Sequence, residues 1–417
     1  MIVTVTDRRR SGRWPRVAAV AILLVFAAIV VRLITFQSPR LVPRVSFAPV
    51  LRLPGSAPAP AWPAGGEAAL VVPGLGSLGS AGGQDPTPTA SLAKVMTAYL
   101  TLEKFPLNGT DAGFTITVTP AEAQAEADDV KQDQSVVAVR AGEQLDERQL
   151  LEALLIPSGD NIAQILAAYD AGSVSRFVAE MNTTARALGM ARTTYTDPSG
   201  YEPTTVSDAS DQLRVFQRAM RFAVFRQIVS LSSVTLPVAG TVRNYDPLIS
   251  EGYDGKTGSD SEAEGCLAFF KYLTVGGRRL TVIGVVLGQG EGGVTSVILD
   301  AAAAAAQRLV GSVTPAIRAR TVLPAHTAVM VAGSADGHRV AGVTAGPLKV
   351  IGWGGLHEHV AIGTRPLGTA LTAGQGIGEA ALTGSLPTAA AEQTQTIVTA
   401  SSALPTPGIL WRLEHLL

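Results

Sequence analysis

The feature that most constrains this chain is an unbroken apolar run near its N-terminus, VAAVAILLVFAAIVV, at residues 17–31. A helix needs about 20 residues to cross a bilayer. The run reaches that length when Leu33 to Phe36 are added and Arg32 extends its charged end toward the interface. Five arginines lie just before the run, within residues 8–16, and this bias orients the N-terminus toward the cytoplasm. We therefore expect a cytoplasmic basic tail over residues 1–16, a single transmembrane anchor over residues 17–36, and an extracytoplasmic remainder.

A cleaved signal peptide is the alternative interpretation of the same run. Small residues suited to cleavage, such as Ala57 and Ala59, lie far beyond the apolar run and among prolines. The stretch of residues 37–65 is rich in proline and has no helical periodicity, as is typical of a semi-rigid linker. The sequence favours an uncleaved anchor and a linker, with the folded chain beginning near residue 66.

Residues 66–312 combine helical and strand patterns. Two apolar, strand-like segments flank Gly276 and Gly277, a dipeptide typical of a tight hairpin turn. Apolar residues recur at helical spacing over residues 91–104, 146–156, 161–170, 173–189 and 294–310. The sequence therefore predicts an α+β domain in which helices flank an antiparallel sheet.

The tail over residues 313–417 has a different pattern. Short segments that often alternate apolar and polar residues are separated by glycines and prolines, which is typical of strands and turns. We expect a small C-terminal β-rich domain without a catalytic set of its own.

Composition excludes several classes of function. The net charge is −1, so nothing indicates a nucleic-acid partner. The single cysteine, Cys266, rules out an intrachain disulfide framework and a cysteine-rich metal site. Because it lies in the apolar segment CLAFF, we expect it to be a buried small hydrophobic residue.

The predicted α+β domain contains no histidine to serve in catalysis. All five histidines are at position 326 or later, so residues 66–325 cannot hold a Ser-His-Asp triad or a Cys-His pair by themselves. A histidine-based zinc site is excluded there as well. In the tail, His357-Glu358-His359 could place two imidazoles on one face of a strand, but a solvated strand face is the favoured interpretation and we expect no metal. A nucleophile in this domain therefore needs a lysine or a carboxylate as its base.

Lysine is scarce, with only six among 33 basic residues. One of them, Lys94, follows Ser91 by three residues at the head of a helical pattern. Another, Lys256, is followed by Thr257 and Gly258. A nucleotide-binding P-loop is rejected for this second segment, because Ser250 occupies the position of a required glycine and a strand follows where a helix is needed.

Three short segments in this order form a known constellation. They are Ser91-Leu92-Ala93-Lys94, Ser158-Gly159-Asp160 and Lys256-Thr257-Gly258, which match the S-x-x-K, S-x-N and K-T-G elements of penicillin-binding proteins and class A β-lactamases. The wider text, including EALLIPSGDNIAQILA, TDPSGY and GYDGKTGSDSEAEGCLAFF, resembles the low-molecular-mass D-alanyl-D-alanine carboxypeptidases over residues 66–310. The resemblance implies a β-lactamase/transpeptidase-like fold with a helical subdomain, and it is compatible with that family's C-terminal β-domain.

The resemblance also implies a reaction and roles for individual residues. Ser91 would be the nucleophile, Lys94 its base, and Ser158 the donor of a proton to the departing D-alanine. Lys256, Thr257, Gly258 and Ser259 would bind the substrate, with the N–H groups of Ser91 and Ser259 facing the oxyanion. The substrate would be a peptidoglycan stem peptide ending in D-Ala-D-Ala, β-lactams would be covalent inhibitors, and no cofactor or metal is needed.

The physical logic holds without the family. Side chains three residues apart on a helix share a face, so Lys94 can reach Ser91. A serine hydroxyl is a weak nucleophile until a base takes its proton. Lysine acts as that base only when burial and a neighbouring cation, such as Lys256, favour its neutral form.

One position departs from the family pattern. The third residue of the S-x-N element is Asp160, and Asn161 follows it. A carboxylate cannot donate to a substrate carbonyl as an asparagine amide does, and it favours the charged form of Lys94. Three outcomes stay open: Asn161 takes over substrate binding through a local shift, Asp160 is protonated or repurposed, or activity is reduced.

The sequence leaves competing functions. A non-catalytic or weakly active homologue that binds peptidoglycan or β-lactams is the main alternative, because of Asp160. A β-lactamase would need a glutamate to activate the deacylating water, and no segment resembles that enzyme's glutamate loop. A purely structural envelope protein would make the three motifs a coincidence.

Overall fold

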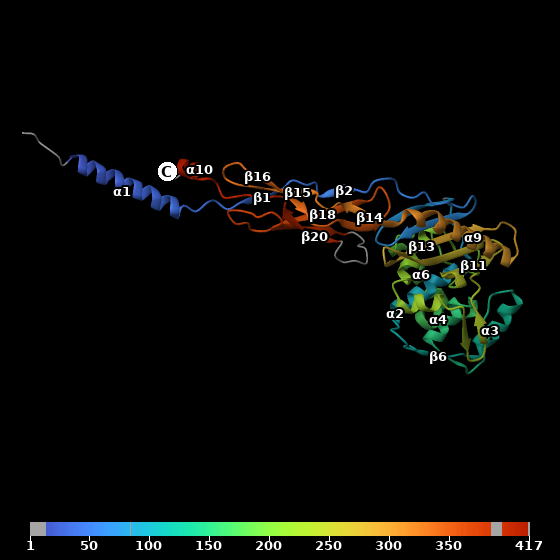
Figure 1. The fold of residues 1–417 in the computed structure, drawn as a ribbon. Helices are drawn as coiled ribbons and strands as arrows, with labels where there is room; N and C mark the ends of the chain where they lie inside the picture. The colour runs from blue at the N-terminus through green and yellow to red at the C-terminus, as the bar shows by residue number, and fades with distance from the viewer. Residues whose placement is uncertain (1–13, 84, 385–393, 416–417) are drawn as a thin grey trace, which may run out of the picture. The chain divides into compact units, whose positions relative to one another are not determined.

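The computed structural model describes residues 14–83, 85–384 and 394–415, and its chain divides into two compact units. The central unit comprises residues 52–320 and 351–356, and the terminal unit comprises residues 1–51, 321–350 and 357–417. Figure 1 follows the chain through both units. Residues 1–13 of the expected cytoplasmic tail lie outside the described residues.

The central unit is built on a five-stranded antiparallel sheet of order β11-β12-β13-β3-β4. Its strands are β3 (Glu67–Val72), β4 (Gly76–Ala81), β11 (Tyr253–Asp260), β12 (Glu264–Val275) and β13 (Arg278–Gln289). Gly276 and Gly277 have φ values of 55° and 75°, which is the left-handed conformation that a two-residue turn of this type requires. The predicted hairpin is therefore confirmed.

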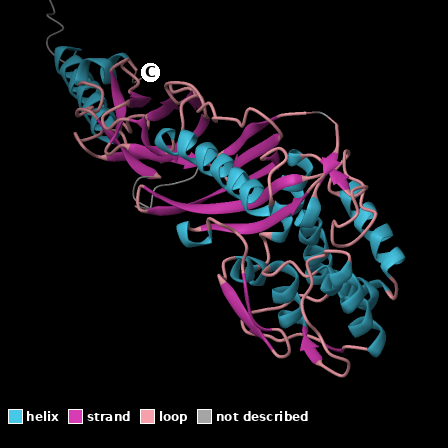
Figure 2. Ribbon diagram, turned by 90° about the vertical axis from the view of Figure 1, so that its right-hand side faces the viewer, coloured by secondary structure: helices cyan, strands magenta, loops and turns pink. Residues whose placement is uncertain are grey.

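Helices cover both faces of this sheet. On one face, α9 (Thr295–Val313) packs along β12 and β13 (Figure 2). On the other face, α7 (Ala209–Ala219) packs on β13 and β3 and also contacts α2. The remaining helices are α2 (Ala93–Lys104), α3 (Pro120–Lys131), α4 (Glu147–Leu155), α5 (Asp160–Ala171), α6 (Val174–Ala187) and α8 (Ala223–Val229). The predicted α+β class is confirmed.

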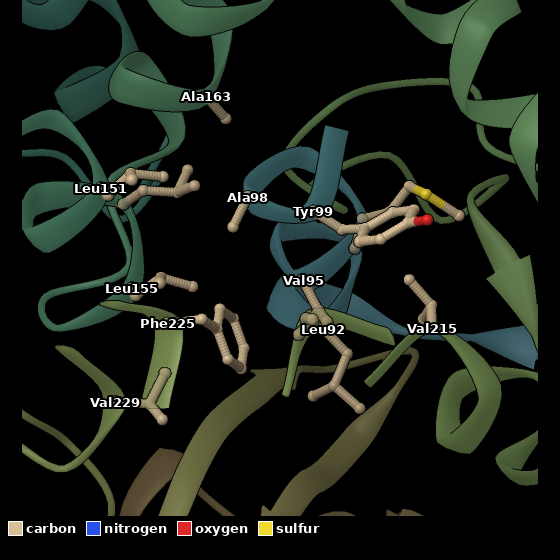
Figure 3. Close-up of a cluster of buried hydrophobic side chains, with 14 of the residues drawn as sticks. Leu92, Val95, Ala98, Tyr99, Leu151, Leu155, Ala163, Val215, Phe225 and Val229 are labelled. Carbon is tan, nitrogen blue, oxygen red and sulfur yellow. The ribbon is translucent and has the colours of Figure 1, made fainter. Parts of the chain in front are cut away.

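The core of the central unit surrounds α2. Leu92, Val95 and Ala98 face neighbouring helices that contribute Leu151 and Phe225 (Figure 3). A helix that is apolar on nearly every side is stable only when it is enclosed, and nine of the twelve residues of α2 are buried. A polar side chain on α2 is therefore desolvated unless it opens onto a pocket.

Short two-stranded ladders complete the central unit. They are β5 (Thr87–Pro88) with β8 (Val206–Ser207), β6 (Thr115–Thr117) with β7 (Gln144–Asp146), and β9 (Ser233–Leu236) with β10 (Gly240–Arg243). Cys266 is fully buried on β12, as the sequence indicated. Burial raises the pKa of its thiol to about 12, so it is an inert core residue at neutral pH.

The terminal unit is a seven-stranded sheet of order β1-β15-β16-β20-β19-β18-β2. Its strands are β1 (Val42–Val45), β2 (Val50–Arg52), β15 (Ala328–Gly333), β16 (Arg339–Thr344), β18 (His357–Thr364), β19 (Gly376–Thr383) and β20 (Gln395–Ala400). β14 (Arg318–Leu323) and β17 (Leu348–Gly352) lie across the unit boundaries. On β18, His357 and His359 are exposed whereas Glu358 is buried.

The expected linker over residues 37–65 is in part folded. β1 pairs with β15, and β2 lies beside β18 at the other end of the sheet order. The boundary drawn at residue 313 also differs, because the β-rich unit takes strands from both ends of the chain. The sequence did not indicate β1 because it is a four-residue edge strand that contains Pro43. Proline is tolerated at a sheet edge, but in a sequence it argues against a strand.

The apolar run forms α1 (Trp14–Thr35), a 22-residue helix without a buried residue. At a rise of about 1.5 Å per residue it spans about 33 Å, enough for a bilayer core. α9 is also long and apolar enough to cross a membrane, but it is half buried and serves as the core helix described above. The chain ends in the short helix α10 (Ile409–Glu414).

Candidate active site

Ser91 lies on a short 3₁₀ turn, η1 (Ala90–Leu92), that runs directly into α2. The next turn carries Lys94, whose Nζ is 2.7 Å from Ser91 Oγ. Ala90 has a φ of 45°, a strained conformation for a residue with a side chain. The loop at Gly200 packs so tightly on the Ala90 carbonyl that a Cβ at position 200 would clash. The tight turn is therefore fixed in place by its surroundings.

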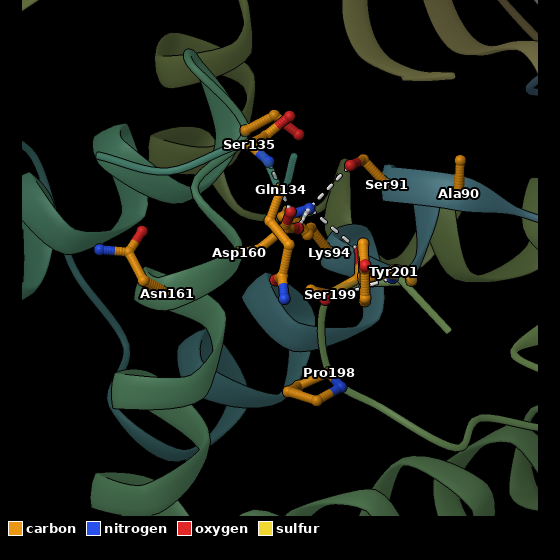
Figure 4. Close-up of polar contacts among 12 residues, drawn as sticks. Ala90, Ser91, Lys94, Gln134, Ser135, Asp160, Asn161, Pro198, Ser199 and Tyr201 are labelled. Atoms are coloured by element: carbon orange, nitrogen blue, oxygen red, sulfur yellow. Dashed lines mark hydrogen bonds and ion pairs between the residues drawn. The ribbon is translucent and has the colours of Figure 1, made fainter. Parts of the chain in front are cut away.

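Lys94 is completely buried, yet its Nζ has three oxygen atoms as hydrogen-bond partners. Its Nζ contacts Ser91 Oγ, the carbonyl oxygen of Ser199 at 3.0 Å and Asp160 Oδ1 at 2.5 Å (Figure 4). An amine that meets three oxygens in this way can satisfy three N–H groups. The lysine that the sequence singled out thus connects the nucleophile to two other segments of the chain.

The Ser199 carbonyl is positioned by Asp197, a residue that the sequence reasoning did not single out. Asp197 Oδ2 accepts hydrogen bonds from the backbone N–H groups of Ser199, Gly200 and Tyr201, while Oδ1 accepts one from the Thr205 hydroxyl. Such an aspartate-capped turn is a local sequence signal in TDPSGY. The hydrogen bond from Lys94 to the Ser199 carbonyl joins residues more than a hundred positions apart, and no local sequence signal indicates it.

Asp160 is the first residue of α5 and bridges two groups. Its Oδ1 pairs with Lys94, and its Oδ2 accepts the backbone N–H of Ser135 at 2.9 Å. Its own N–H donates to the Ser135 carbonyl at 2.6 Å. The carboxylate therefore ties the segment around Ser135 to the lysine beside the nucleophile.

Asn161 does not reach the pocket that holds Ser91. Its amide oxygen accepts the N–H of Val137 at 3.0 Å, and its amide nitrogen donates to the Val137 carbonyl at 2.8 Å. Figure 4 shows the side chain directed away from Ser91. The expectation that Asn161 contacts the substrate is thus replaced by a structural role, because successive residues at a helix start point about 100° apart.

Ser158 and Lys256 form a second pair. Lys256 Nζ is 2.9 Å from Ser158 Oγ and donates to the Thr257 carbonyl at 2.8 Å. Ser158 has a φ of 69°, a conformation unusual for serine and often found at functional sites. Lys256 is buried, and this desolvation, reinforced by the charge of Lys94, lowers its pKa well below the ordinary value although Asp160 and Asp246 oppose the shift.

Asp246, which the sequence reasoning assigned no role, lies near Lys256. Its Oδ1 accepts the N–H of Leu248 at 2.8 Å, whereas its buried Oδ2 has no partner among the described residues. Burial raises its pKa to about 6, and the charge of Asp254 adds to the shift while Lys256 opposes it. It supplies negative potential behind the Lys256 ammonium.

β11 carries Thr257, Gly258 and Ser259 along the outer edge of the central sheet. A Cβ at Gly258 would lie 2.9 Å from Leu92 Cδ1 and 3.0 Å from the Thr89 carbonyl oxygen. Only glycine therefore lets the strand approach the turn that holds the nucleophile. As an outer strand, β11 pairs only with β12 in this sheet, so alternate backbone groups face away from it.

These residues enclose a pocket of about 340 Å³. Ser91, Ser158, Thr257, Gly258 and Ser259 all line it, together with residues that the sequence did not indicate: Gln134, Ser135, Val136, Pro157, Tyr245, Thr295 and Leu299. Lys94, Asp160 and Lys256 lie behind this wall as buried partners of the two serines. The structure thus brings together every predicted site residue except Asn161.

The pocket has the geometry of a serine nucleophile beside a buried lysine, and the comparisons with known proteins agree. The D-alanyl-D-alanine carboxypeptidase family profile matches residues 79–290, that is 212 of 417 residues, and this range contains all three motifs. The chain belongs to this family. It is accordingly a serine-type peptidase with the penicillin-binding fold.

Individual members of the D-alanyl-D-alanine carboxypeptidase family are recognisably similar. The D-alanyl-D-alanine carboxypeptidase DacB2 of Mycobacterium tuberculosis is 34% identical over 240 residues, covering 55% of this chain and 76% of the relative. A D-alanyl-D-alanine carboxypeptidase of Streptomyces sp. strain K15 is 33% identical over 219 residues, covering 48% and 72%.

The crystal structure of the Streptomyces K15 DD-transpeptidase aligns with a TM-score of 0.51 at 26% identity, covering 64% of this chain and all of that one. It confirms the transpeptidase-like fold. None of these comparisons favours a β-lactamase or a structural envelope protein.

Proposed function

We propose that this chain removes the terminal D-alanine from peptidoglycan stem peptides through an acyl-enzyme on Ser91. The observation that carries the proposal is the 2.7 Å contact between Ser91 Oγ and the Nζ of buried Lys94, at a pocket that also exposes Ser158 and the Thr257–Ser259 strand. A nucleophile held against a buried base is the arrangement that acyl transfer needs.

In the acylation step, Lys94 Nζ takes the proton of Ser91 Oγ as the oxygen attacks the carbonyl carbon of the penultimate D-alanine. The negative charge on the carbonyl oxygen is stabilised by the N–H groups of Ser91 and Ser259. The C–N bond then breaks as Ser158 passes a proton to the departing amine of D-alanine, and the proton that Lys94 took from Ser91 replaces it on Ser158, so Lys94 is again neutral. Water hydrolyses the resulting ester by the reverse use of the same groups and regenerates Ser91.

Lys256 and Thr257 would hold the carboxylate at the end of the peptide. A buried lysine has an unfavourable ammonium form until an anion approaches, and Lys256 is such a residue. A substrate carboxylate at Thr257 would supply that anion. β-Lactams carry a carboxylate and a strained amide, so we expect them to acylate Ser91 in the same orientation.

Asp160 modifies this mechanism and does not prevent it. A carboxylate 2.5 Å from Lys94 Nζ stabilises the ammonium that forms after Ser91 loses its proton, and it also favours that ammonium before the reaction. The second effect opposes catalysis. We therefore expect a functional but slowed acylation step.

Intact-mass spectrometry of the full chain incubated with benzylpenicillin tests the proposal, with Ser91→Ala as the control. An adduct on the native chain alone, together with D-alanine release from a synthetic peptide ending in D-Ala-D-Ala, is the expected result. No adduct and no released D-alanine in a folded sample would overturn it. Adding a D-amino acid as an acceptor separates hydrolysis from transpeptidation, since transfer gives a product of different mass.

We also propose that α1 is not cleaved and serves as a single-pass membrane anchor, with the peptidase on the extracytoplasmic side of the membrane. The support is a 22-residue apolar helix without buried residues, preceded by arginines. The mass of the protein extracted from membranes tests this proposal. A mass that includes residues 1–36 is expected, whereas a chain shortened beyond residue 36 would show that the helix is a signal sequence.

A further inference from the structure

A second pocket, of about 410 Å³, lies in the terminal unit, far from the catalytic residues in sequence. Three of its lining residues are arginines: Arg40 and Arg44 come from the approach to β1 and from β1 itself, and Arg339 begins β16. Among the described residues, no carboxylate lines the pocket. Neither the proposed peptidase reaction nor the family comparison assigns it a role.

Strand register places two of these arginines on one face of the sheet. Val42 of β1 is opposite Gly333 of β15, which is opposite Arg339 of β16. Side chains two residues apart on a strand share a face, so Arg44 lies on the same face as Val42 and hence as Arg339. On β15, Ala332 points to the other face of the sheet and is buried in the core. The arginines therefore occupy the solvent side.

Gly333 leaves the floor between the arginines open. A Cβ at this position would have only two neighbours within 4 Å, the His338 carbonyl oxygen at 3.9 Å and Arg339 Cγ at 4.0 Å. The absence of a side chain opposite Val42 creates the hollow. A small anionic group can enter it without displacing protein atoms.

The charge of this pocket is not neutralised by the protein. In the part of the chain that the structure describes, Arg40, Arg44 and Arg339 take part in no salt bridge or side-chain hydrogen bond. The neighbouring Asp336 is already used: its carboxylate accepts a hydrogen bond from the Ser334 hydroxyl, which lowers its pKa, and it lies 4.0 Å from His338 Nε2. Three exposed guanidinium groups without a partner among the described residues leave this hollow positively charged and accessible to an anion from outside.

The pocket is close to the end of α1 along the chain. Arg40 follows Thr35, the last residue of α1, by five residues, and five residues span at most about 18 Å. Phe36 lies in edge contact with Trp411 of α10, with ring centroids 6.2 Å apart. Tryptophan is enriched where membrane helices meet the bilayer surface, and Trp411 is such a residue.

We propose that Arg40, Arg44 and Arg339 bind the phosphate of an anionic phospholipid headgroup at the surface of the membrane that α1 crosses. Guanidinium groups bind phosphate oxygens in pairs and with defined geometry, and arginines next to an anionic membrane surface are attracted to it. The inference rests on the proposed anchor. It does not depend on the proposed peptidase activity.

The test is native mass spectrometry of the full chain in detergent with phosphatidylglycerol or phosphatidylcholine added. Arg44→Gln/Arg339→Gln removes two charges from the pocket, and Arg365→Gln/Lys349→Gln removes two from elsewhere in the terminal unit as the matched control. Each charge near a membrane surface contributes about fivefold in affinity. The pocket variant is therefore expected to bind phosphatidylglycerol about 30-fold more weakly, while the control binds like the native chain.

Equal retention of the two lipids by the native chain would overturn the proposal. So would equal loss in the pocket variant and its control, or displacement of the lipid by inorganic phosphate at millimolar concentration, which would indicate a site for free anions. Thermal unfolding of each variant, followed by circular dichroism, verifies the fold. The penicillin adduct on Ser91 in the same samples reports the peptidase site separately, so failure of one proposal is distinguishable from failure of the other.

Discussion

Replacing Asp160 with asparagine is expected to speed acylation of Ser91. The substitution keeps the shape of the side chain and one acceptor for Lys94, but it removes the negative charge 2.5 Å from the lysine nitrogen. The new amide nitrogen takes the place of Oδ2 beside the Ser135 N–H and does not reach the pocket. The loss of the charge beside Lys94 is therefore the change that favours the reaction.

The size of the effect follows from the buried ion pair. Two unit charges at this separation attract by about 7 kcal/mol at an effective dielectric constant of 20. Much of this attraction is offset by the desolvation of both groups, and the asparagine retains a hydrogen bond to a charged group worth about 1.5–3 kcal/mol. A remainder of about 1.4–2.8 kcal/mol corresponds to a 10- to 100-fold faster acylation.

Stopped-flow or quenched-flow measurement of benzylpenicillin acylation at pH 7.5 provides the assay. Asp170→Asn is the control, because Asp170 pairs with Lys104 at 2.8 Å and joins the same two helices, α2 and α5, ten residues further along each. It removes one charge from an ion pair whose lysine is half exposed, without touching the pocket. We expect Asp170→Asn to leave the rate within about twofold of the native rate.

A native-like or slower rate in folded Asp160→Asn would refute this reasoning. In that case Asp160 would be a working part of the site, for example by accepting the proton that Lys94 takes from Ser91. A melting temperature lowered by Asp160→Asn is compatible with either result, because removing one partner of a buried pair leaves the other unpaired. The rate, measured on the folded fraction, decides.

Three further substitutions test other features of the site and its support. Gly258→Ala is expected to slow acylation about 100-fold with the fold retained by circular dichroism, because the new Cβ would meet Leu92 and the Thr89 carbonyl at 2.9–3.0 Å; an unchanged rate would show that the strand and turn move apart freely. Asn161→Ala is expected to lower the free energy of unfolding by about 1–3 kcal/mol, measured in urea, since both amide contacts with Val137 are lost. Glu147→Gln tests a buried carboxyl whose pKa burial raises to about 7. Because the folded state holds this proton more tightly than the unfolded state, native stability falls as pH rises from about 4.5 through 7. The variant is thus expected to gain up to about 3 kcal/mol over the native chain above pH 7 and nothing at pH 4.5, and a gain that does not depend on pH would contradict this account.

Local patterns predicted those parts of the site that lie within one element. Ser91 and Lys94 are three residues apart on one helical segment, so spacing alone placed their side chains together. Likewise Gly276 and Gly277 determine a turn that depends on their own backbone conformation. Such relations need no knowledge of distant residues.

The orientation of Asp160 and Asn161 could not be obtained in this way. Which of the two faces Lys94 depends on where α5 begins, and that start is set by the hydrogen bonds to Ser135 and Val137 from a separate segment. A shift of the helix start by one residue would exchange the two side chains. Helix boundaries are the least certain element of any pattern.

The strands β1 and β2 were missed for a related reason. They are four and three residues long, too short for an alternation to be recognised, and prolines surround them. Their stability comes from pairing with strands whose sequence lies some 280 residues later, as in the pair Val45 and Met330. The proline-rich composition of residues 37–65 therefore indicated a linker where the structure has the strands β1 and β2.

This interleaving has a consequence for the release of the peptidase by proteolysis, given the membrane anchor proposed above. The chain passes between the two units four times, after residues 51, 320, 350 and 356. A protease that cuts the chain once at any of these crossings leaves the peptidase covalently joined to the strands that begin or end the terminal unit. Cutting just after residue 51 would even leave the anchor attached, since β1 remains hydrogen-bonded to β15. Release of the peptidase then requires either a second cut or the separation of β1 from β15. The pairing of these two strands therefore holds the N-terminal segment to the rest of the chain after a single cut.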